Sequence, residues 1–391
     1  MIFKKQVVIK EIERESSYDY RLLKTWAEID LSSLRNNIKF ISRRTGRDIA
    51  IMAIVKCNAY GHGAVEVSRE AVKLGVKALG VSSLSEGIEL RNVFSEIPII
   101  VLSSGMSGQA EEFIEHRLSP VVCSWQMVNA LSEAARSRGT KAAVHIKIDT
   151  GMGRIGVWHK QADEFVRAVY NVPDIVIEGI CSHFATSDEE DLEFANQQLS
   201  WFADFLDKIS DIPVRFRHIS NTGGIFNLPS AHLNMVRPGL SIYGVSPSDF
   251  VKDSVKLKPV LSLKTKIAFI KKIPEGRALS YGRTFVTDKP MKVATLPVGY
   301  GDGYPRMLSN RGYVLIGGKK ARILGTVTMD QMMVDITGIR NAKVEDVAIL
   351  IGKQGREEIT AREVARMADT IPYEIFTSIN KRVQRIYIDR D

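Results

Sequence analysis

The sequence predicts an α/β protein with an N-terminal (β/α)8 TIM-type barrel and a C-terminal mainly-β domain. From about residue 49, short apolar segments rich in Ile and Val alternate with amphipathic helical patterns, as in strand–helix units of a parallel sheet. After about Lys256 the helical patterns become rare, and strand-like runs are separated by glycine-containing turns. The length of 391 residues also exceeds what one ordinary core requires.

Eight apolar segments are candidates for the barrel strands: residues 49–55, 78–82, 97–103, 118–123, 142–148, 175–181, 215–220 and 234–236. Helical periodicity between them is clearest at 64–74, 125–136 and 192–209. Asp30 precedes apolar positions at three- and four-residue spacing, so it is a candidate helix cap. An open doubly wound sheet is the alternative, and it is disfavoured because no Gly-x-Gly-x-x-Gly motif opens the first helix. We therefore expect an extension at residues 1–24, the barrel at 25–256 and the β domain at 257–391.

The composition is that of a globular protein, with 45% hydrophobic and 25% charged residues. No apolar run approaches the roughly 18 residues that span a bilayer, and the first 24 residues hold no segment long enough for a secretory signal. The net charge of +9 comes from scattered basic residues, so neither a nucleic-acid nor a membrane partner is expected. Cys57, Cys123 and Cys181 lack metal-ligand spacing, and we expect reduced, buried thiols in a cytoplasmic protein without a metal site.

Lys56 closes the first predicted barrel strand, directly after the apolar run that ends at Val55. A charged ammonium in an apolar wall is costly, because burial disfavours the charged form. The amine is therefore either paired, extended to solvent from the strand end, or neutral and able to form a Schiff base. Taken alone, the lysine favours the structural reading over the nucleophile.

Residues at the carboxyl ends of barrel strands surround a single site. The candidates at these positions are Lys56, Tyr60, Lys147, Arg154, His183, Asn221, Thr222, Arg237, Gly239 and Leu240. They include no carboxylate pair, Ser-His-Asp set or metal cluster, and their amine, guanidinium and hydroxyl groups suit an anionic, aldehyde-bearing cofactor. Asn221-Thr222-Gly223-Gly224 follows the seventh strand, where barrels commonly bind phosphate, although an ordinary glycine turn explains it equally well.

The string Val-Lys-Cys-Asn-Ala-Tyr-Gly-His-Gly, residues 55–63, resembles the cofactor-lysine motif of the alanine racemases. These are pyridoxal-phosphate enzymes with a barrel and a second β domain. The resemblance recurs at residues 182–188, 236–239 and 371–374, and it extends from about Thr25 to the C-terminus. It implies that Lys56 carries pyridoxal 5'-phosphate as a Schiff base. It also implies that Tyr60, Asn221, Thr222, Gly239, Leu240 and Tyr373 hold the phosphate.

Further roles follow from the same resemblance. His183 is expected near the cofactor ring, and Arg154 is expected to bridge the cofactor's phenolic oxygen and the substrate carboxylate. The lysine that matches Lys147 is carbamylated in many members, which turns a cation into an anion that orients the arginine. Arg237 is expected beside the pyridine nitrogen. Because arginine stays charged, it donates a hydrogen bond there without readily giving up a proton, which favours reprotonation at Cα over transamination.

The β domain carries turns that resemble the pieces alanine racemases insert into the partner subunit's barrel. By this resemblance Tyr281 is the second base, Met329 and Asp330 border the substrate, and Tyr300 and Arg306 line the entrance. The resemblance thus implies a homodimer with shared sites. Two positions depart from the family pattern: Thr328 stands where cysteine is frequent, and Pro372 where asparagine is common.

The expected function is racemisation of L- and D-alanine by a two-base mechanism, with Lys56 and Tyr281 as the bases, supplying D-alanine for peptidoglycan. A racemase of broader specificity, acting on serine or other small amino acids, is the alternative. A pyridoxal-phosphate decarboxylase is less favoured, because its acidic partner for the pyridine nitrogen is replaced by Arg237. A non-enzymatic pyridoxal-phosphate carrier lacks the β domain and so fits this chain poorly.

Overall fold

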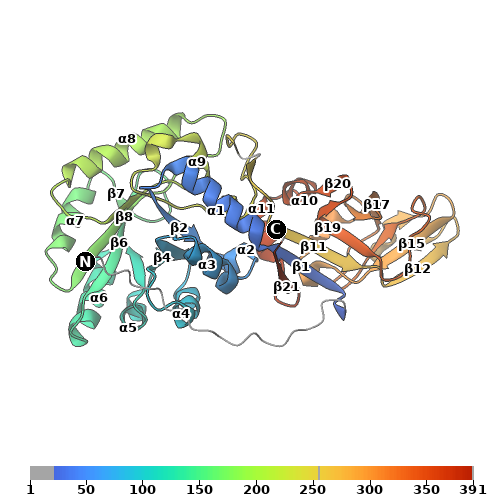
Figure 1. The fold of residues 1–391 in the computed structure, drawn as a ribbon, viewed down its shortest axis with the longest axis horizontal. Helices are drawn as coiled ribbons and strands as arrows, with labels where there is room; N and C mark the ends of the chain where they lie inside the picture. The colour runs from blue at the N-terminus through green and yellow to red at the C-terminus, as the bar shows by residue number, and fades with distance from the viewer. Residues whose placement is uncertain (1–21, 254–255, 390–391) are drawn as a thin grey trace.

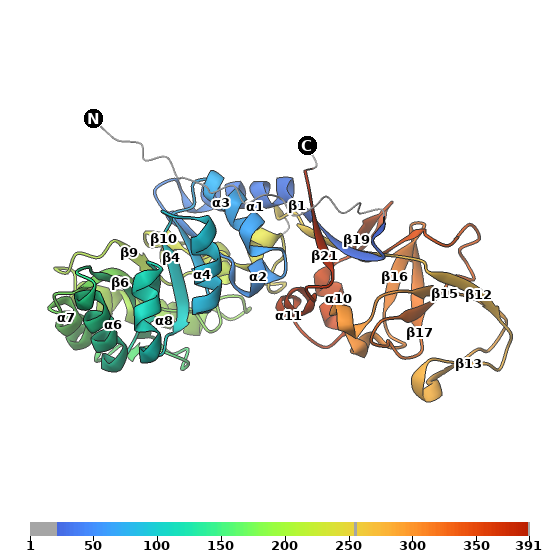
Figure 2. The ribbon, with the colours of Figure 1, turned by 90° about the horizontal axis from the view of Figure 1, so that it is seen from below.

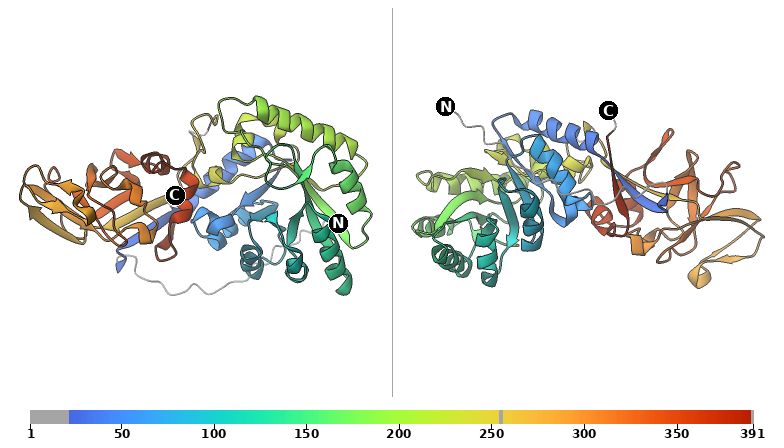
Figure 3. Two further views of the ribbon diagram at one scale, coloured as in Figure 1. Left: turned by 180° about the vertical axis from the view of Figure 1, so that it is seen from behind. Right: turned by 60° about the horizontal axis from the view of Figure 1, so that its bottom comes forward.

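The computed structural model describes residues 22–253 and 256–389. The chain forms an elongated molecule with a barrel at one end and a β-rich domain at the other (Figure 1). Figure 3 shows the β-rich domain as a separate lobe in two further views. The extension predicted for residues 1–24 lies almost entirely outside the described residues.

The barrel sheet confirms the predicted fold class. Its strands are β2 (Ala50–Ile54), β3 (Ala78–Val81), β4 (Ile99–Ser104), β5 (Ser119–Val122), β6 (Ala142–Asp149), β8 (Ile175–Cys181), β9 (Phe216–His218) and β10 (Met235–Val236). They pair in parallel in the order β10-β2-β3-β4-β5-β6-β8-β9, and the short β7 (Val157–Trp158) pairs with β6. Each lies within one of the segments predicted from the sequence or extends one residue beyond it. The carboxyl ends of the eight strands therefore meet at one end of the sheet.

The barrel closes between β9 and β10 through bonds that continue beyond both short strands. The amide of Arg237 donates to the carbonyl of Ser220 at 2.9 Å. At the other end, Asn234 Oδ1 accepts from the amide of Arg217 at 2.7 Å and Asn234 Nδ2 donates to the carbonyl of Arg215 at 2.9 Å. The closure fixes Arg237 directly beside the end of β9.

Helices cover the outside of the sheet (Figure 2). They are α1 (Leu31–Thr45), α3 (Ala64–Lys73), α4 (Leu84–Val93), α5 (Ala110–Glu115), α6 (Trp125–Ser137), α7 (Ala162–Tyr170), α8 (Glu193–Lys208) and α9 (Thr222–Asn227). Asp30 caps α1 as predicted, because its carboxylate accepts from the amides of Ser32 and Ser33. Within the described ranges, no helix is both long and apolar enough to cross a membrane.

The second domain is built on a sheet in the order β12-β15-β18-β17-β16-β19-β11-β1-β21. Its strands are β1 (Thr25–Asp30), β11 (Leu261–Lys266), β12 (Phe269–Ile273), β15 (Met291–Leu296), β16 (Tyr313–Ile316), β17 (Lys319–Leu324), β18 (Met332–Asp335), β19 (Val347–Gln354), β20 (Glu357–Ile359) and β21 (Gln384–Ile388). A small hairpin, β13 (Ala278–Leu279) with β14 (Phe285–Val286), extends from it, and α10 (Ala361–Met367) and α11 (Pro372–Ser378) pack beside it.

Strand β1 corrects the predicted domain boundary. Residues 25–30 were assigned to the barrel, but β1 lies between β11, which is antiparallel to it, and β21, which is parallel. Thr25 pairs with Thr265 and Trp26 with Gln384. Trp26, Ala27 and Ile29 are buried there, so the N-terminal strand completes the core of the C-terminal sheet before the chain enters the barrel.

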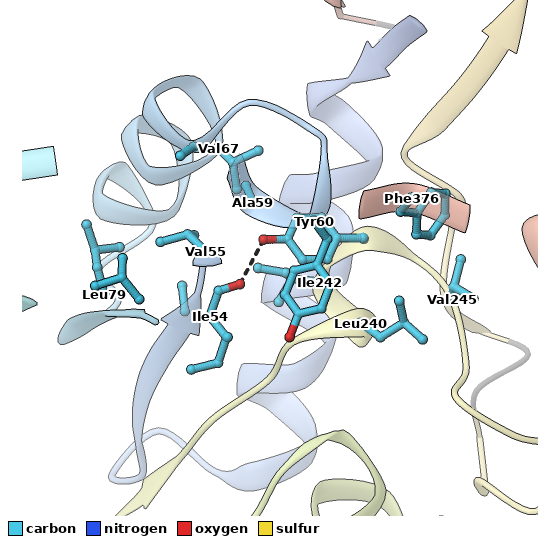
Figure 4. Packing of buried hydrophobic residues seen from close by; sticks show 14 of the residues in the cluster. Ile54, Val55, Ala59, Tyr60, Val67, Leu79, Leu240, Ile242, Val245 and Phe376 are labelled. Atoms are coloured by element: carbon cyan, nitrogen blue, oxygen red, sulfur yellow. Dashed lines mark hydrogen bonds between the residues drawn. The ribbon is translucent and has the colours of Figure 1, made fainter. Parts of the chain in front are cut away.

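The two domains share one continuous hydrophobic core. Figure 4 shows Tyr60 beside Leu240 and Ile242 of the barrel, with Phe376 of the C-terminal domain nearby. Tyr243 also contacts this region, because its hydroxyl donates to the carbonyl of Ile54 at 2.8 Å. The end of β2 is therefore held by residues from both domains.

Candidate active site

Lys56 begins α2 (Lys56–Tyr60), a single turn whose residues have unusual backbone angles. Cys57, Asn58, Ala59 and Tyr60 all have φ values of 51–52°, in the left-handed region. For residues other than glycine this conformation costs roughly 1–2 kcal/mol each, so the surroundings must hold it in place. The turn exposes Cys57, so the expectation of a buried thiol is wrong at this position; Cys181 is buried and Cys123 is half-buried.

A cavity of about 630 Å³ lies at the carboxyl ends of the strands. It brings together ten of the predicted residues: Lys56, Tyr60, Lys147, Arg154, His183, Asn221, Thr222, Arg237, Gly239 and Tyr373. Leu240 follows Gly239 and is fully buried at the start of a short 3-10 helix, Leu240–Tyr243. The lining residues from the barrel, which extend from Lys56 to Gly239, thus surround one space, as the barrel topology requires.

One side of the cavity is built from Tyr60, Tyr373 and the start of α9. Asn221 caps α9, and its Oδ1 accepts from the amide of Gly224 at 3.0 Å and from the hydroxyl of Ser187 at 2.7 Å. A Cβ atom on Gly239 would lie 2.7 Å from the hydroxyl oxygen of Tyr60, so a larger residue at this position would displace that hydroxyl. Burial raises the pKa of Tyr60 and of Tyr373, and both hydroxyls therefore stay protonated as hydrogen-bond donors.

Arg237 also lines the cavity and is 5% exposed. Its Nη2 donates to the carbonyls of Ser182 at 2.8 Å and Ile219 at 3.0 Å and contacts His183 Nδ1 at 3.0 Å. Its Nη1 contacts His218 Nδ1 at 2.7 Å. Burial lowers the pKa of Arg237 to about 10, so the guanidinium is charged at neutral pH. It therefore acts only as a donor.

Lys147 lies in a strongly cationic part of the site. Burial lowers its pKa to about 8, with a contribution from Arg237 and Arg154. His183 has a pKa well below 6.5 because of burial and the neighbouring Lys147. Arg154 is exposed on a loop shaped by Asp149, whose Oδ1 accepts from the amides of Gly151 at 2.9 Å and Gly153 at 3.1 Å. The positive charges of Lys147, Arg154 and Arg237 thus favour binding of an anion in this part of the cavity.

Comparison with known proteins settles the family. The profile of the alanine racemase N-terminal domain matches residues 29–247, and that of the C-terminal domain matches residues 260–387. The chain belongs to the alanine racemase family. An alanine racemase of Halothermothrix orenii is 44% identical over 367 residues, which cover 93% of this chain and 96% of that protein. The solved structure of the alanine racemase of Clostridium difficile 630 has a TM-score of 0.90 at 38% identity, covering 94% of this chain and 96% of that one.

Alanine racemases are pyridoxal-phosphate-dependent enzymes, and this chain is accordingly a pyridoxal-phosphate-dependent amino-acid racemase. The solved alanine racemase of Bartonella henselae, described with covalently bound pyridoxal phosphate, has a TM-score of 0.85 at 29% identity, covering 94% of this chain and 100% of that one. The cavity fits this cofactor. It offers an amine for the aldehyde, protonated phenols and a helix start for the phosphate, and a charged donor for the ring nitrogen.

The other residues predicted for the active site do not line this cavity in the part of the chain that the structure describes. They are Tyr281, Tyr300, Arg306, Met329 and Asp330, all exposed on the C-terminal domain. Tyr281 is 75% exposed and follows β13, which Figure 2 places far from the barrel strands of the same chain. One chain therefore does not bring its two predicted bases together.

The two departures from the family pattern have structural explanations. Thr328 Oγ1 donates to the carbonyl of Gln331 at 2.8 Å and accepts from its amide at 3.2 Å, closing the turn that presents Met329 and Asp330. Pro372 is buried at the first position of α11, where proline's missing amide donor costs nothing.

Two buried histidines in the barrel interior, His145 and His218, were not among the residues predicted from the sequence. His218 and His145 are fully buried, and His218 Nε2 lies 2.9 Å from His145 Nδ1. The signal was present in β6, where His145 and Lys147 are two residues apart. Alternate residues of a barrel strand face the same side, so His145 shares the interior with Lys147.

Proposed function

We propose that this chain interconverts L- and D-alanine as a homodimer, with each site formed by the barrel of one copy and the C-terminal domain of the other. The observation that carries the proposal is the amine of Lys56 directly after a buried strand, in a cavity that also holds Arg237, Arg154 and Lys147. This donor set suits a bound carboxylate and phosphate. D-alanine made in this way would supply peptidoglycan, and we place the enzyme in the cytoplasm.

When bound, pyridoxal phosphate supplies an electron-withdrawing ring that makes the Cα–H of an attached amino acid acidic. Lys56 is the residue we assign to its aldehyde. Tyr60, Tyr373, Asn221, Thr222, Gly239 and Leu240 surround the position we assign to the phosphate, and His183 lies beside Arg237. Arg237 would donate a hydrogen bond to the ring nitrogen and keep its own proton, because a guanidinium stays charged. This arrangement favours return of the proton to Cα.

Arg154 is suited to hold the substrate carboxylate because its loop extends to the cavity mouth. A carbamylated Lys147 would give it an anionic partner. A neutral amine is the form that adds carbon dioxide, and the lowered pKa of Lys147, about 8, increases the fraction of that form near neutral pH. Met329 and Asp330 of the second copy would border the substrate, with Tyr300 and Arg306 at the entrance.

Racemisation removes a proton from one face of Cα and returns one to the other, which two fixed groups achieve more simply than one mobile group. Lys56 serves one face. Tyr281 of the second copy is our candidate for the other, because its exposed position on the β13–β14 hairpin leaves it free to enter another barrel. We assign the α-proton of D-alanine to Lys56 and that of L-alanine to Tyr281.

The test is the Tyr281→Ala variant with each enantiomer in deuterated water. Exchange of the α-proton of D-alanine should persist while inversion nearly stops, and exchange from L-alanine should fall sharply. If both enantiomers exchange and invert at close to the unsubstituted rate, Tyr281 is not the second base. The same assay with a panel of small L-amino acids separates an alanine enzyme from one of broader specificity.

A further inference from the structure

The left-handed turn that follows Lys56 is held at both ends by charged side chains. At its start, Glu86 Oε1 accepts from the amide of Cys57 at 2.6 Å, and Glu86 belongs to α4 of the same barrel. At its end, the carbonyl of Gly61 accepts from Nε of Arg385 at 2.9 Å. Arg385 belongs to β21, so the second contact comes from the other domain.

Arg385 is itself fixed by its other hydrogen bonds. Nη1 donates to the carbonyls of Asn380 at 2.8 Å and Val383 at 2.6 Å, and Nη2 donates to the carbonyl of Ile379 at 2.7 Å. The planar guanidinium thus joins the segment after α11 to the end of the lysine turn. Lysine has one ammonium and cannot reproduce this fork.

The space between the turn and the C-terminal domain is filled. A Cβ atom on Gly61 would lie 2.2 Å from the carbonyl oxygen of Phe376, and one on Gly63 would lie 1.8 Å from the hydroxyl of Tyr387. The ring centroids of Tyr60 and Tyr373 are 5.8 Å apart. The turn therefore packs against this domain along its length, and Arg385 supplies the directional bond in that contact.

We propose that Arg385 is a positioning residue for the cofactor lysine. By holding Gly61 against the C-terminal domain, it keeps residues 57–60 in the left-handed conformation and so sets the direction of Lys56 and Tyr60. The same guanidinium fixes the segment that follows Tyr373, so the amine and the two tyrosines are aligned by one group. The proposal rests on the assignment of Lys56 as the cofactor lysine.

Arg91 provides a matched control. Its guanidinium also donates to four carbonyls, those of His116, Phe94, Ile97 and Arg117, at distances of 2.8–3.0 Å. These bonds lie on the outside of the barrel, at the ends of α4 and α5. Arg91→Ala therefore removes a similar set of bonds without touching the lysine turn.

The experiment is amide hydrogen–deuterium exchange of the full chain, without and with bound pyridoxal phosphate, for Arg385→Ala, Arg385→Lys and Arg91→Ala. Arg385→Ala should speed exchange in residues 57–63 by about tenfold or more in both states, the effect of losing one charged hydrogen bond. Arg385→Lys should give a smaller increase, and Arg91→Ala should leave these residues unchanged. Titration followed by cofactor absorbance should show weaker pyridoxal phosphate binding for Arg385→Ala, and kcat should fall more than KM rises.

Unchanged exchange in residues 57–63 in both Arg385 variants would overturn the proposal, as would an equal increase in Arg91→Ala. If Arg385→Ala does not fold, Arg385→Lys carries the test, and full protection of the turn in that variant contradicts the inference. Faster exchange with unaltered cofactor affinity and absorbance would overturn the positioning role of Arg385 if borohydride reduction labels Lys56. A label on another lysine would instead overturn the assignment of Lys56, which separates the failure of the two proposals.

Discussion

Nη1 of Arg237 lies 2.7 Å from Nδ1 of His218, and a guanidinium can only donate, so the histidine must accept there. His218 then carries its proton on Nε2, which donates to Nδ1 of His145 at 2.9 Å. His145 in turn carries its proton on Nε2, which faces Glu178 Oε2 at 3.6 Å. Two hydrogen bonds, from Arg237 to His218 and from His218 to His145, thus run in one direction, and the Glu178 carboxylate lies beyond them without a hydrogen bond to His145.

This direction predicts the tautomers of both histidines. Nitrogen NMR of the imidazole rings should show His218 and His145 as Nε2–H tautomers at pH 7. Burial and the neighbouring Arg237 lower the pKa of His218 well below 6.5, so His218 should stay neutral through pH 6. An Nδ1–H tautomer at His218, or protonation of His218 near pH 6.5, would contradict this hydrogen-bond arrangement.

Replacing Lys147 by Met should stabilise the fold in buffer free of carbon dioxide. The pKa of Lys147 in the folded protein, about 8, lies below the ordinary value of 10.5. The buried ammonium therefore lowers the free energy of unfolding by its full amount below pH 8, and this loss of stability disappears as the pH rises toward 10.5. At about 1.4 kcal/mol per pKa unit, removing it should raise the free energy of unfolding at pH 7 by up to about 3 kcal/mol.

Denaturant titration at pH 7 and pH 10 checks this expectation for Lys147→Met. The gain should shrink at the higher pH, where the unsubstituted chain has lost most of the penalty. Activity should fall, because Arg154 loses the partner that a carbamylated lysine would provide. Equal stabilities of the two proteins at pH 7 would show that the charge is not penalised.

Lys56 should be the single residue that carries the cofactor. Reduction of the holoenzyme with borohydride, followed by peptide mass spectrometry, should place the label on the peptide that contains Lys56. Lys147 is the internal comparison, because its amine lies in the same cavity. A label on Lys147 would instead identify Lys147 as the lysine that binds the cofactor.

Two inactive variants should restore one another's activity if the site is shared. Lys56→Ala and Tyr281→Ala lose different components, and a mixed dimer of the two retains one site with both. After the two variants are mixed and their subunits have exchanged, about half of the dimers contain one copy of each variant. Each of these dimers has one intact site out of two, so up to about a quarter of the unsubstituted activity should return. With exchange verified by mass, no recovery would indicate that each chain builds its own site.

Thr328→Val should loosen the turn that presents Met329 and Asp330. The valine has the same shape but loses the two hydrogen bonds to Gln331, worth about 1 kcal/mol each in unfolding free energy. KM for alanine should rise, and Thr328→Ser should behave like the unsubstituted enzyme because it keeps the hydroxyl. Equal KM values for the valine and serine variants would remove this role for the threonine hydroxyl.

The sequence by itself located the barrel strands and most of the residues around the cavity. Apolar alternation is a local property, and residues 118–123 and 125–136 were assigned from fewer than 20 neighbouring positions, matching β5 and α6 closely. Lys56, Arg237 and Thr222 could be placed at one end of the sheet because parallel strands carry their carboxyl ends to the same side.

The tertiary structure alone decided what depends on long-range pairing or opposes local preference. Strand β1 joins residues about 240 and 360 positions away, as in the pairs Thr25–Thr265 and Trp26–Gln384, and no local pattern encodes such partners. The left-handed turn at residues 57–60 contains no glycine, so propensity predicts against it, and contacts with distant residues such as Glu86 and Arg385 help to hold it. Tyr281 was identified from its motif, but its exposure on a hairpin remote from its own barrel emerged only once the two domains were packed together.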